Sequence, residues 1–494
     1  MRLAVRRYEF GPPEDRTLVA GLRASQLCVV ATSLLLAVGI VRSSGSSMMF
    51  AGALAVITAG GVIAFWSVGG RTAEQWVPVA VRWSSRRFRG QTRYHSAAPL
   101  LGHVDGEATP SPPDTLAGVR IIAERLDGAG TVGIVHDRQA GTYAALLAVR
   151  GRSFQLADVA EQERRLAAWG AVLSGLARAR SPIHRMQWVE RTVPDDGDAM
   201  GRYLARSVRA RAGHSSLSSY LELVDHAGPV TQQHETLLAV SISAGKARRH
   251  IRQAGGGDAG AAKVLMRELL SLRRELASAD IIVDGALTPR LVSRVFRTGF
   301  EPNARASMAR RAAAAGDAPG TSPANAWPLA TETVWAAFRV ADVWHATYWI
   351  AHWPRTSVGS DFLVSLLLGT TAMRTVSLTM EPISPLRAHR DVEQQAVKGL
   401  ADDELRSRAG FRTSARRLRE RQSVDRRERE LADGHADYRL AGYVTVTAAS
   451  EEDLEAACGE VEQAAQQSFL ELRRLYGQQD RAFTYTLPLC RGLS

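Results

Sequence analysis

Two apolar runs near the N-terminus constrain the fold more than any other feature of the sequence. The first covers residues 25–41, the second covers residues 48–68, and a polar break of one arginine, one glycine and four serines separates them. Each run is close to the roughly 20 residues that a helix needs to cross a bilayer. Because a helix satisfies its own backbone hydrogen bonds in lipid, residues 25–70 are predicted to form a two-helix transmembrane hairpin.

Two other interpretations of this segment stay open. One is a buried core hairpin of a soluble domain, although runs near 20 residues exceed the length of a typical core helix. The other is a signal peptide. That interpretation is disfavoured because the first run starts late, lacks a small-residue cleavage site and is followed by a second run.

Arginines flank the hairpin on both sides and predict its orientation. The connecting turn carries only Arg42. Because basic residues near the ends of spans favour the cytoplasmic side, we expect a protein of the cell (inner) membrane with two spans and with both termini in the cytoplasm. Trp66 and Trp76 are expected near the second interface. The flanking arginines are Arg2, Arg6, Arg7, Arg16 and Arg23 before the first run, and Arg71, Arg82, Arg86, Arg87, Arg89 and Arg93 after the second.

The charge balance of the chain suggests its class of partner. The 494 residues carry a formal net charge of +12, which fits cytoplasmic flanks of a membrane span, anionic lipid headgroups or nucleic acid. Because the arginines beside the hairpin supply much of the excess, lipid is favoured over DNA. Cys28, Cys458 and Cys490 are widely separated, so they suggest neither a metal site nor a disulfide framework.

The sequence beyond the hairpin predicts an α+β protein with mixed or antiparallel sheets and packed helices. Shifts in composition divide it into six parts. These are a cytoplasmic arm (1–24), the hairpin (25–70), a basic juxtamembrane segment and linker (71–115), a first soluble domain (116–299), a flexible linker (300–326) and a second soluble domain with long charged helices (327–494).

Periodicity predicts the elements of both soluble domains. Strands are expected at 119–124, 131–136, 142–149, 184–193, 235–243, 344–353, 374–382, 438–448 and 469–475. Helices are expected at 156–177, from about 200, at 220–226, 259–278, 361–368, from 385 to 432 with a break near 410, and at 451–467.

The chemically suggestive motifs fall short of a catalytic or metal site. The glycine-rich stretch 255–263 resembles a phosphate loop, but Val264 follows its lysine where a hydroxyl residue is required, so Asp258 is predicted to cap a helix instead. The acidic turn 195–198 has no further ligands at metal-loop spacing. His345 and His352 differ in strand parity and cannot share a metal from one strand. We therefore expect no enzyme activity, cofactor or metal.

Two arginine clusters are candidate binding surfaces. In the juxtamembrane segment they are Arg82, Arg86, Arg87, Arg89 and Arg93, which with neighbouring aromatic residues suit a bilayer surface. On the second charged helix they are Arg416, Arg417 and Arg419. That helix is either solvated and held by local ion pairs, or it contacts a partner subunit or DNA.

Several motifs read together with the hairpin resemble a known family. They are DRQAGTY (137–143), AEQERRLAAWG (160–170), QWVERT (187–192), WHATYWIAHWP (344–354), TMEPISP (379–385) and LPLCRG (487–492). The sequence resembles the integral membrane proteins of actinobacterial conjugation-like, type IV secretion-like gene clusters. The resemblance implies a PrgI-type or VirB-type membrane hairpin joined to the non-catalytic N-terminal half of a VirB-type secretion ATPase, with the motor on a separate polypeptide.

Two functions follow as expectations. The favoured one is a structural component of such an apparatus that docks a motor ATPase and polytopic channel proteins at the inner membrane, with a homo-oligomer possible. The alternative is a membrane-tethered protein that handles DNA, suggested by residues 86–93 and 412–429.

Overall fold

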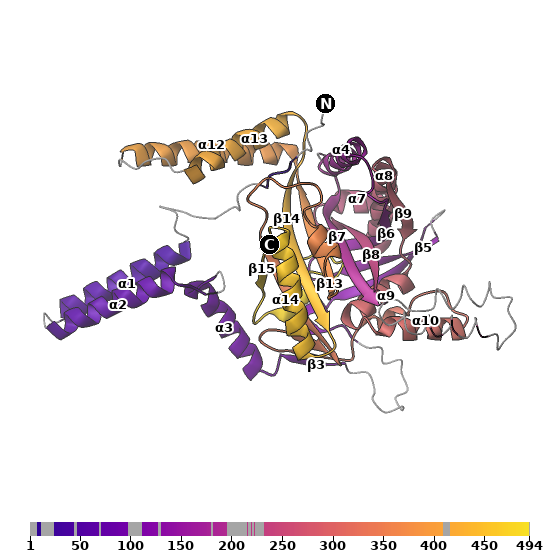
Figure 1. Ribbon diagram of the computed structural model, residues 1–494, viewed down its shortest axis with the longest axis horizontal. Coiled ribbons are helices and arrows are strands. Elements are labelled where there is room, and N and C mark those ends of the chain that lie inside the picture. The colour runs from indigo at the N-terminus through magenta and orange to yellow at the C-terminus, as the bar shows by residue number, and fades with distance from the viewer. Residues whose placement is uncertain are drawn as a thin grey trace.

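The computed structural model describes residues 7–10, 24–43, 47–68, 71–96, 111–126, 130–178, 181–194, 215, 219, 222, 232–408 and 415–493. Its first two helices, α1 (Ala24–Ser43) and α2 (Ser47–Phe65), form an antiparallel hairpin that projects from the body (Figure 1). Each contains an 18-residue stretch that is long and apolar enough to cross a membrane. A two-stranded ribbon, β1 (Ser67–Val68) and β2 (Arg71–Thr72), and helix α3 (Ala73–Phe88) lead to the body.

The body is built on one large sheet. Its 13 strands in the described chain all pair antiparallel, so the protein is mixed α/β with a large antiparallel sheet. The strands are β3 (Arg93–His95), β4 (Val119–Leu126), β5 (Gly130–Asp137), β6 (Thr142–Gly151), β7 (Ile183–Pro194), β8 (Gln232–Ser243), β9 (Ile281–Ala286), β10 (Ala330–Thr333), β11 (Phe338–Val340), β12 (Val343–His352), β13 (Met373–Ile383), β14 (Asp437–Ala448) and β15 (Glu471–Arg474).

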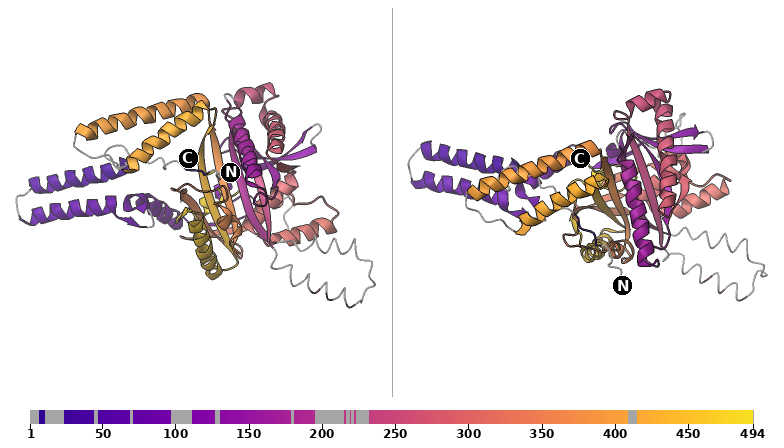
Figure 2. Two further views of the ribbon diagram at one scale, coloured as in Figure 1. Left: turned by 45° about the horizontal axis from the view of Figure 1, so that its top comes forward. Right: turned by 90° about the horizontal axis from the view of Figure 1, so that it is seen from above.

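Helices cover both faces of this sheet, as Figure 2 shows. Helices α4, α8, α11 and α14 pack on one face, while α9, α15 and the segment 484–491 fill the other. The helices of the body are η1 (Asp114–Leu116), α4 (Val159–Leu176), α7 (Arg248–Gln253), α8 (Gly257–Ser278), α9 (Pro289–Phe300), α10 (Ala304–Ala314), η3 (Pro323–Ala326), α11 (Val364–Leu368), α12 (Pro385–Arg408), α13 (Ala415–Ala432), α14 (Glu451–Gln467) and α15 (Gln479–Phe483).

The sheet runs without a break through the two predicted soluble domains. Strand β7 of the first pairs with β13 of the second, with Trp188 opposite Leu378. The stretch predicted as a flexible linker, 300–326, instead contains α10 and η3, and the side chains of Arg305, Met308 and Ala326 in it are buried. That prediction was wrong because contacts with the body, rather than local periodicity, hold this alanine- and arginine-rich stretch in helices.

The two halves of the body repeat one topology. The first runs η1-β4-β5-β6-α4-β7, a long connection, then β8-α7-α8-β9-α9, and the second runs η3-β10-β11-β12-α11-β13, a long connection with α12 and α13, then β14-α14-β15-α15, so α7 has no counterpart in the second half. The strand orders also match: β7-β8-β6-β5-β4 with β9 on β6, and β13-β14-β12-β11-β10 with β15 on β12. A pseudo-two-fold axis therefore lies between β7 and β13.

Most predicted elements agree with the described structure. The nine predicted strands correspond to β4–β8 and β12–β15, and the long charged region contains α12, up to Arg408, and α13, from Ala415, while the break predicted near residue 410 lies outside the described residues. The acidic turn 195–198, the helix expected from about residue 200 and most of 220–226 lie outside the described residues. One detail was wrong: Gly256, with φ of 75°, is the N-cap of α8, and Asp258 instead accepts a hydrogen bond of 2.7 Å from the Tyr143 hydroxyl.

Candidate functional site

The hairpin packs through small side chains and leaves its large apolar ones exposed. Leu35 and Met48 are 73% and 84% exposed, whereas Ala64 is fully buried. A Cβ on Gly60 would lie 2.5 Å from the Ser33 hydroxyl oxygen, so only glycine permits this approach of α2 to α1. Gln26 donates a hydrogen bond of 2.9 Å to the Ala64 carbonyl and closes the open end of the pair.

An aromatic cluster attaches α3 to the body. Trp335, in the turn between β10 and β11, lies with its ring centroid 6.1 Å from that of Trp76 and 5.7 Å from that of Trp83, and Tyr476 completes the group. Gly477, with φ of 71°, donates its N–H to the Trp335 carbonyl at 2.7 Å, and a Cβ there would lie 2.7 Å from the indole. Trp76, expected at a membrane interface, thus contacts the body, whereas Trp66 is 62% exposed.

Two of the five juxtamembrane arginines form ion pairs with distant parts of the body. Arg86 pairs with Asp480 of α15 at 2.5 Å, and the carboxylate, which is hydrogen-bonded to it, raises the pKa of Arg86 against the opposing effect of burial. Arg93 pairs with Glu332 at 2.8 Å as β3 adds to β10. Both predicted membrane-surface residues therefore also fasten α3 and β3 to the body.

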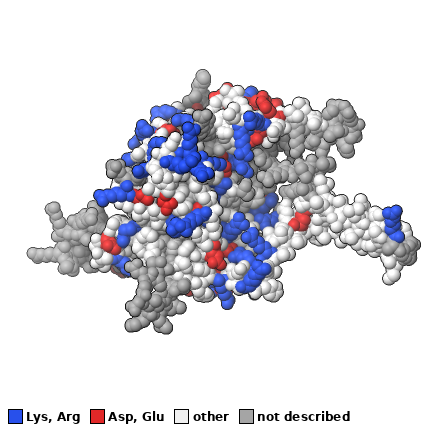
Figure 3. Space-filling view, turned by 180° about the vertical axis from the view of Figure 1, so that it is seen from behind, with Lys and Arg blue, Asp and Glu red and all other residues white. Residues whose placement is uncertain are grey.

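The outward face of α3 is both apolar and basic. Val77, Val81 and Phe88 are 56%, 64% and 92% exposed and share a narrow stripe opposite the aromatic cluster. The other three predicted arginines, Arg82, Arg87 and Arg89, are also exposed. In Figure 3 the projecting hairpin is nearly free of charge apart from its tip and its root, and basic side chains gather on the body beside that root. Exposed apolar and cationic groups on one short helix are typical of helices that lie in a membrane interface.

The charged helices α12 and α13 project from the body as a second hairpin (Figure 2). Arg416, Arg417 and Arg419 belong to α13, but the positions of their side chains lie outside the described part. Closer to the body, Arg427 pairs with Asp437. Arg426 pairs with Glu9 at 2.5 Å and so holds the N-terminal segment 7–10 against the body.

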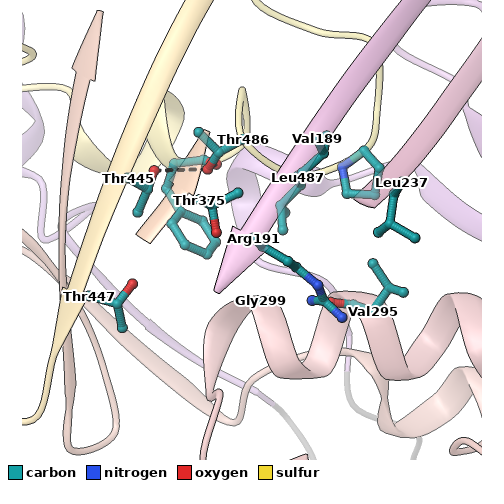
Figure 4. Close-up of a pocket in the computed structure, with 12 residues that line it drawn as sticks. Val189, Arg191, Leu237, Val295, Gly299, Thr375, Thr445, Thr447, Thr486 and Leu487 are labelled. Carbon is teal, nitrogen blue, oxygen red and sulfur yellow. Dashed lines mark hydrogen bonds between the residues drawn. The ribbon is translucent and has the colours of Figure 1, made fainter. Parts of the chain in front are cut away.

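A small cavity lies at the junction of the two halves (Figure 4). It offers about 20 Å³ to the centre of a water molecule, which is room for about one water. Its walls come from β7, β8, α9, β13, β14 and the segment 483–488, and a hydrogen bond of 2.8 Å joins Thr445 to Thr486 across one side. This cavity is too small for an organic substrate or cofactor.

The buried ionisable groups beside the cavity are paired for structural purposes. Burial by itself would raise the pKa of Glu235, but Arg191, Arg305 and Arg294 outweigh that effect and lower it to about 2. Arg191 also donates to the Val295 carbonyl and the Thr298 hydroxyl, both at 3.0 Å. These hydrogen bonds tie β7 and β8 to α9.

His345 and His352 lie in separate environments. Burial lowers the pKa of His345 to about 4, and its ring nitrogens lie 2.9 Å from the Thr447 hydroxyl and the Phe300 carbonyl. His352 lies beside Arg473 and Glu471. Across the described residues, no group of three or more histidine, cysteine or acidic side chains could hold a metal ion.

Comparison with known proteins leaves the site to be interpreted from its own chemistry: no protein-family model and no curated protein matches the sequence.

Proposed function

We propose that this chain is a membrane-anchored scaffold of a conjugation-like, type IV secretion-like apparatus that docks a separate motor ATPase at the inner membrane. The observation that carries the proposal is the exposed apolar hairpin, which is joined through α3 to a large body. A hairpin serving as a buried core element would be covered by the body, yet large apolar residues on both helices are exposed. Burying those side chains in hydrocarbon is strongly favourable.

Helix α3 supports a fixed position of the body at the bilayer surface. Its outward stripe of Val77, Val81 and Phe88 suits the acyl boundary, and Arg82, Arg87 and Arg89 suit anionic headgroups. Its inward face holds Trp76 and Trp83 against Trp335. In this arrangement both termini and the body lie in the cytoplasm, where a motor and channel proteins are accessible.

The partner class comes from the sequence resemblance to VirB-type secretion proteins. The cavity at the junction of the two halves is too small for an organic substrate, which supports a scaffold role for the body. Fractionation of cells that express the full chain tests the anchor. We expect the protein in the membrane fraction after carbonate washing. A cysteine introduced at the C-terminus should not react with an impermeant maleimide in intact cells.

Co-purification in detergent with the cognate VirB-type motor ATPase tests the partner. We expect a stable complex that persists after nuclease treatment. If the protein fractionated as soluble, or bound no motor, the scaffold proposal would be wrong. If the protein and the motor ATPase associated only in the presence of DNA, and if this association weakened steeply as the salt concentration rose, the DNA-handling alternative would be favoured instead.

A further inference from the structure

The repeated topology makes the two outer edges of the sheet comparable. In the second half the edge strand β10 is covered by β3, with Thr331 opposite Tyr94 and Glu332 opposite Arg93. Strand β3 belongs to neither half, since it comes from the segment after α3. In the first half β4 occupies the place of β10, and no described strand pairs with its outer edge.

The backbone of β4 shows which groups this edge offers. Arg138 donates its N–H to the Gly118 carbonyl at 3.2 Å, in register with the β4–β5 ladder. Because strand residues alternate in direction, the even-numbered residues 120–126 direct their N–H and C=O groups toward β5. Those of Val119, Ile121, Ala123 and Arg125 point outward, and none of the described residues hydrogen-bonds to them.

The side chains of β4 leave charges available beside that edge. Arg120 is exposed and Glu124 is half-buried, and neither forms an ion pair with a described residue. Ile122 lies between them on the same face. An eight-residue edge that no described residue pairs with is unusual, since proteins normally pair, cover or interrupt such strands.

The position of the β4 edge and the symmetry of strand pairing limit which kind of partner could bind there. Figures 1 and 2 place the β4–β5 end on the side of the body away from α1 and α2. Antiparallel pairing of β4 with β4 of a second copy would relate the two copies by a two-fold axis that passes between the two strands, perpendicular to the sheet. The two hairpins would then lie at opposite ends of the assembly, where one bilayer cannot receive both. The edge therefore suits a cytoplasmic partner of a different kind.

We propose that an extended segment of the motor ATPase adds to the outer edge of β4 as a further strand, as β3 does on β10. The segment would place an acidic residue opposite Arg120, an apolar residue opposite Ile122 and a basic residue opposite Glu124. Main-chain hydrogen bonds supply the affinity in this mode of recognition, and the alternating side chains supply the specificity. The inference rests on the proposed function and adds to it the location of the docking site.

The test compares two substitutions at one position of the full chain in lipid nanodiscs. Ala123→Pro removes one outward N–H while leaving the ladder to β5 intact, whereas Ala123→Thr retains the N–H in a strand-favouring residue. With the purified cognate ATPase as probe, we expect Ala123→Pro to weaken binding at least about tenfold and Ala123→Thr to bind within about twofold of the wild type. The reversal Arg120→Glu with Glu124→Lys should also weaken binding, with the backbone unchanged.

Hydrogen exchange of the wild type gives an internal control. On adding the ATPase, the amides of residues 119, 121, 123 and 125 should become protected, while those of 120, 122 and 124, already paired with β5, should change little. If the ATPase binds but these outward amides stay unprotected and Ala123→Pro binds like the wild type, the edge assignment is wrong and the scaffold proposal stands. If the wild type binds no ATPase, both are wrong.

Discussion

Arg86 and Asp480 lie 394 positions apart in the chain, yet the guanidinium donates two hydrogen bonds to the carboxylate, at 3.2 and 2.5 Å. The pair joins α3, which follows the apolar hairpin, to α15, which packs against β11 and β12. The body is therefore held to the hairpin by a fixed helix with specific contacts at both its aromatic cluster and its C-terminal end.

Replacing this arginine should loosen the attachment. In Arg86→Gln the Asp480 carboxylate, only 7% exposed, loses its cationic partner, so we expect a loss of about 1–3 kcal/mol in the free energy of unfolding. Denaturant unfolding of the full chain in detergent, followed by tryptophan fluorescence, measures it. Arg82→Gln, an exposed position on the same helix, is the control and should change stability by under about 0.5 kcal/mol. Equal effects of the two substitutions would contradict the role given to Arg86.

Adding a side chain at Gly60 should separate the two apolar helices. The Cβ of Gly60→Val would meet Ser33 at 2.5 Å, while at Gly61 no atom lies within 4 Å. We expect Gly60→Val to destabilise the hairpin by about 1–3 kcal/mol and to slow disulfide formation between cysteines introduced on α1 and α2. Gly61→Val should form that disulfide at the wild-type rate. If both variants cross-linked alike, the close approach at Gly60 would be refuted.

The ion pairs of Glu235 with Arg191 and Arg305 make the stability of the fold depend on pH. Its pKa is lowered to about 2 in the folded protein, below the roughly 4.3 of an unfolded chain. A carboxylate whose pKa is lower in the folded than in the unfolded state stabilises the fold fully at pH values above its unfolded pKa. This contribution is lost as the pH falls from about 4.5 toward 2. Glu235→Gln should therefore be less stable at pH 7 and show a flatter loss of stability across that window. Urea unfolding at several pH values measures the slope, and Glu428→Gln, at an exposed position, should keep the wild-type slope.

The amide of Gln187 holds the junction between the two halves. Its nitrogen donates to the Ser377 hydroxyl and to the Tyr485 and Leu487 carbonyls, and its oxygen accepts the Cys490 N–H at 2.6 Å. In Gln187→Leu these buried groups lose their partner, and we expect a loss of about 3 kcal/mol. Thermal unfolding in detergent tests this against Gln139→Leu at an exposed turn. A midpoint for Gln187→Leu within one degree of the control would show that the amide does not hold the junction.

Local patterns predicted the elements better than their arrangement. Aromatic and β-branched residues identified β12 from residues 344–353, and the helix expected from residue 385 corresponds to the start of α12. The pairing of β7 with β13 left no local signal, since it depends on strands almost 190 residues apart. The repeat was missed for the same reason: its halves share topology and strand order, whereas the loops and helices that separate the strands differ in length.

The sequence predicted which residues belong to the candidate site, but it did not predict which other residues they contact. The positions of Arg86 and Trp76 beside an apolar run indicated a bilayer surface, because charge and aromaticity near a span have that meaning locally. Their partners, Asp480 and Trp335, come from elements that no spacing rule connects to residues 73–88. Long-range ion pairs and aromatic contacts of this kind become visible only when the sheet brings its distant strands together.

The segment 483–491 has a consequence for synthesis. Phe483, Leu487 and Leu489 belong to the same buried cluster as Leu146 and Phe296, yet every strand of the sheet precedes them in the chain. The apolar helices at residues 24–65 leave the ribosome more than 400 residues earlier. During translation the body therefore stays partly open after the hairpin has emerged. This buried cluster is complete only when these nine residues have been synthesised.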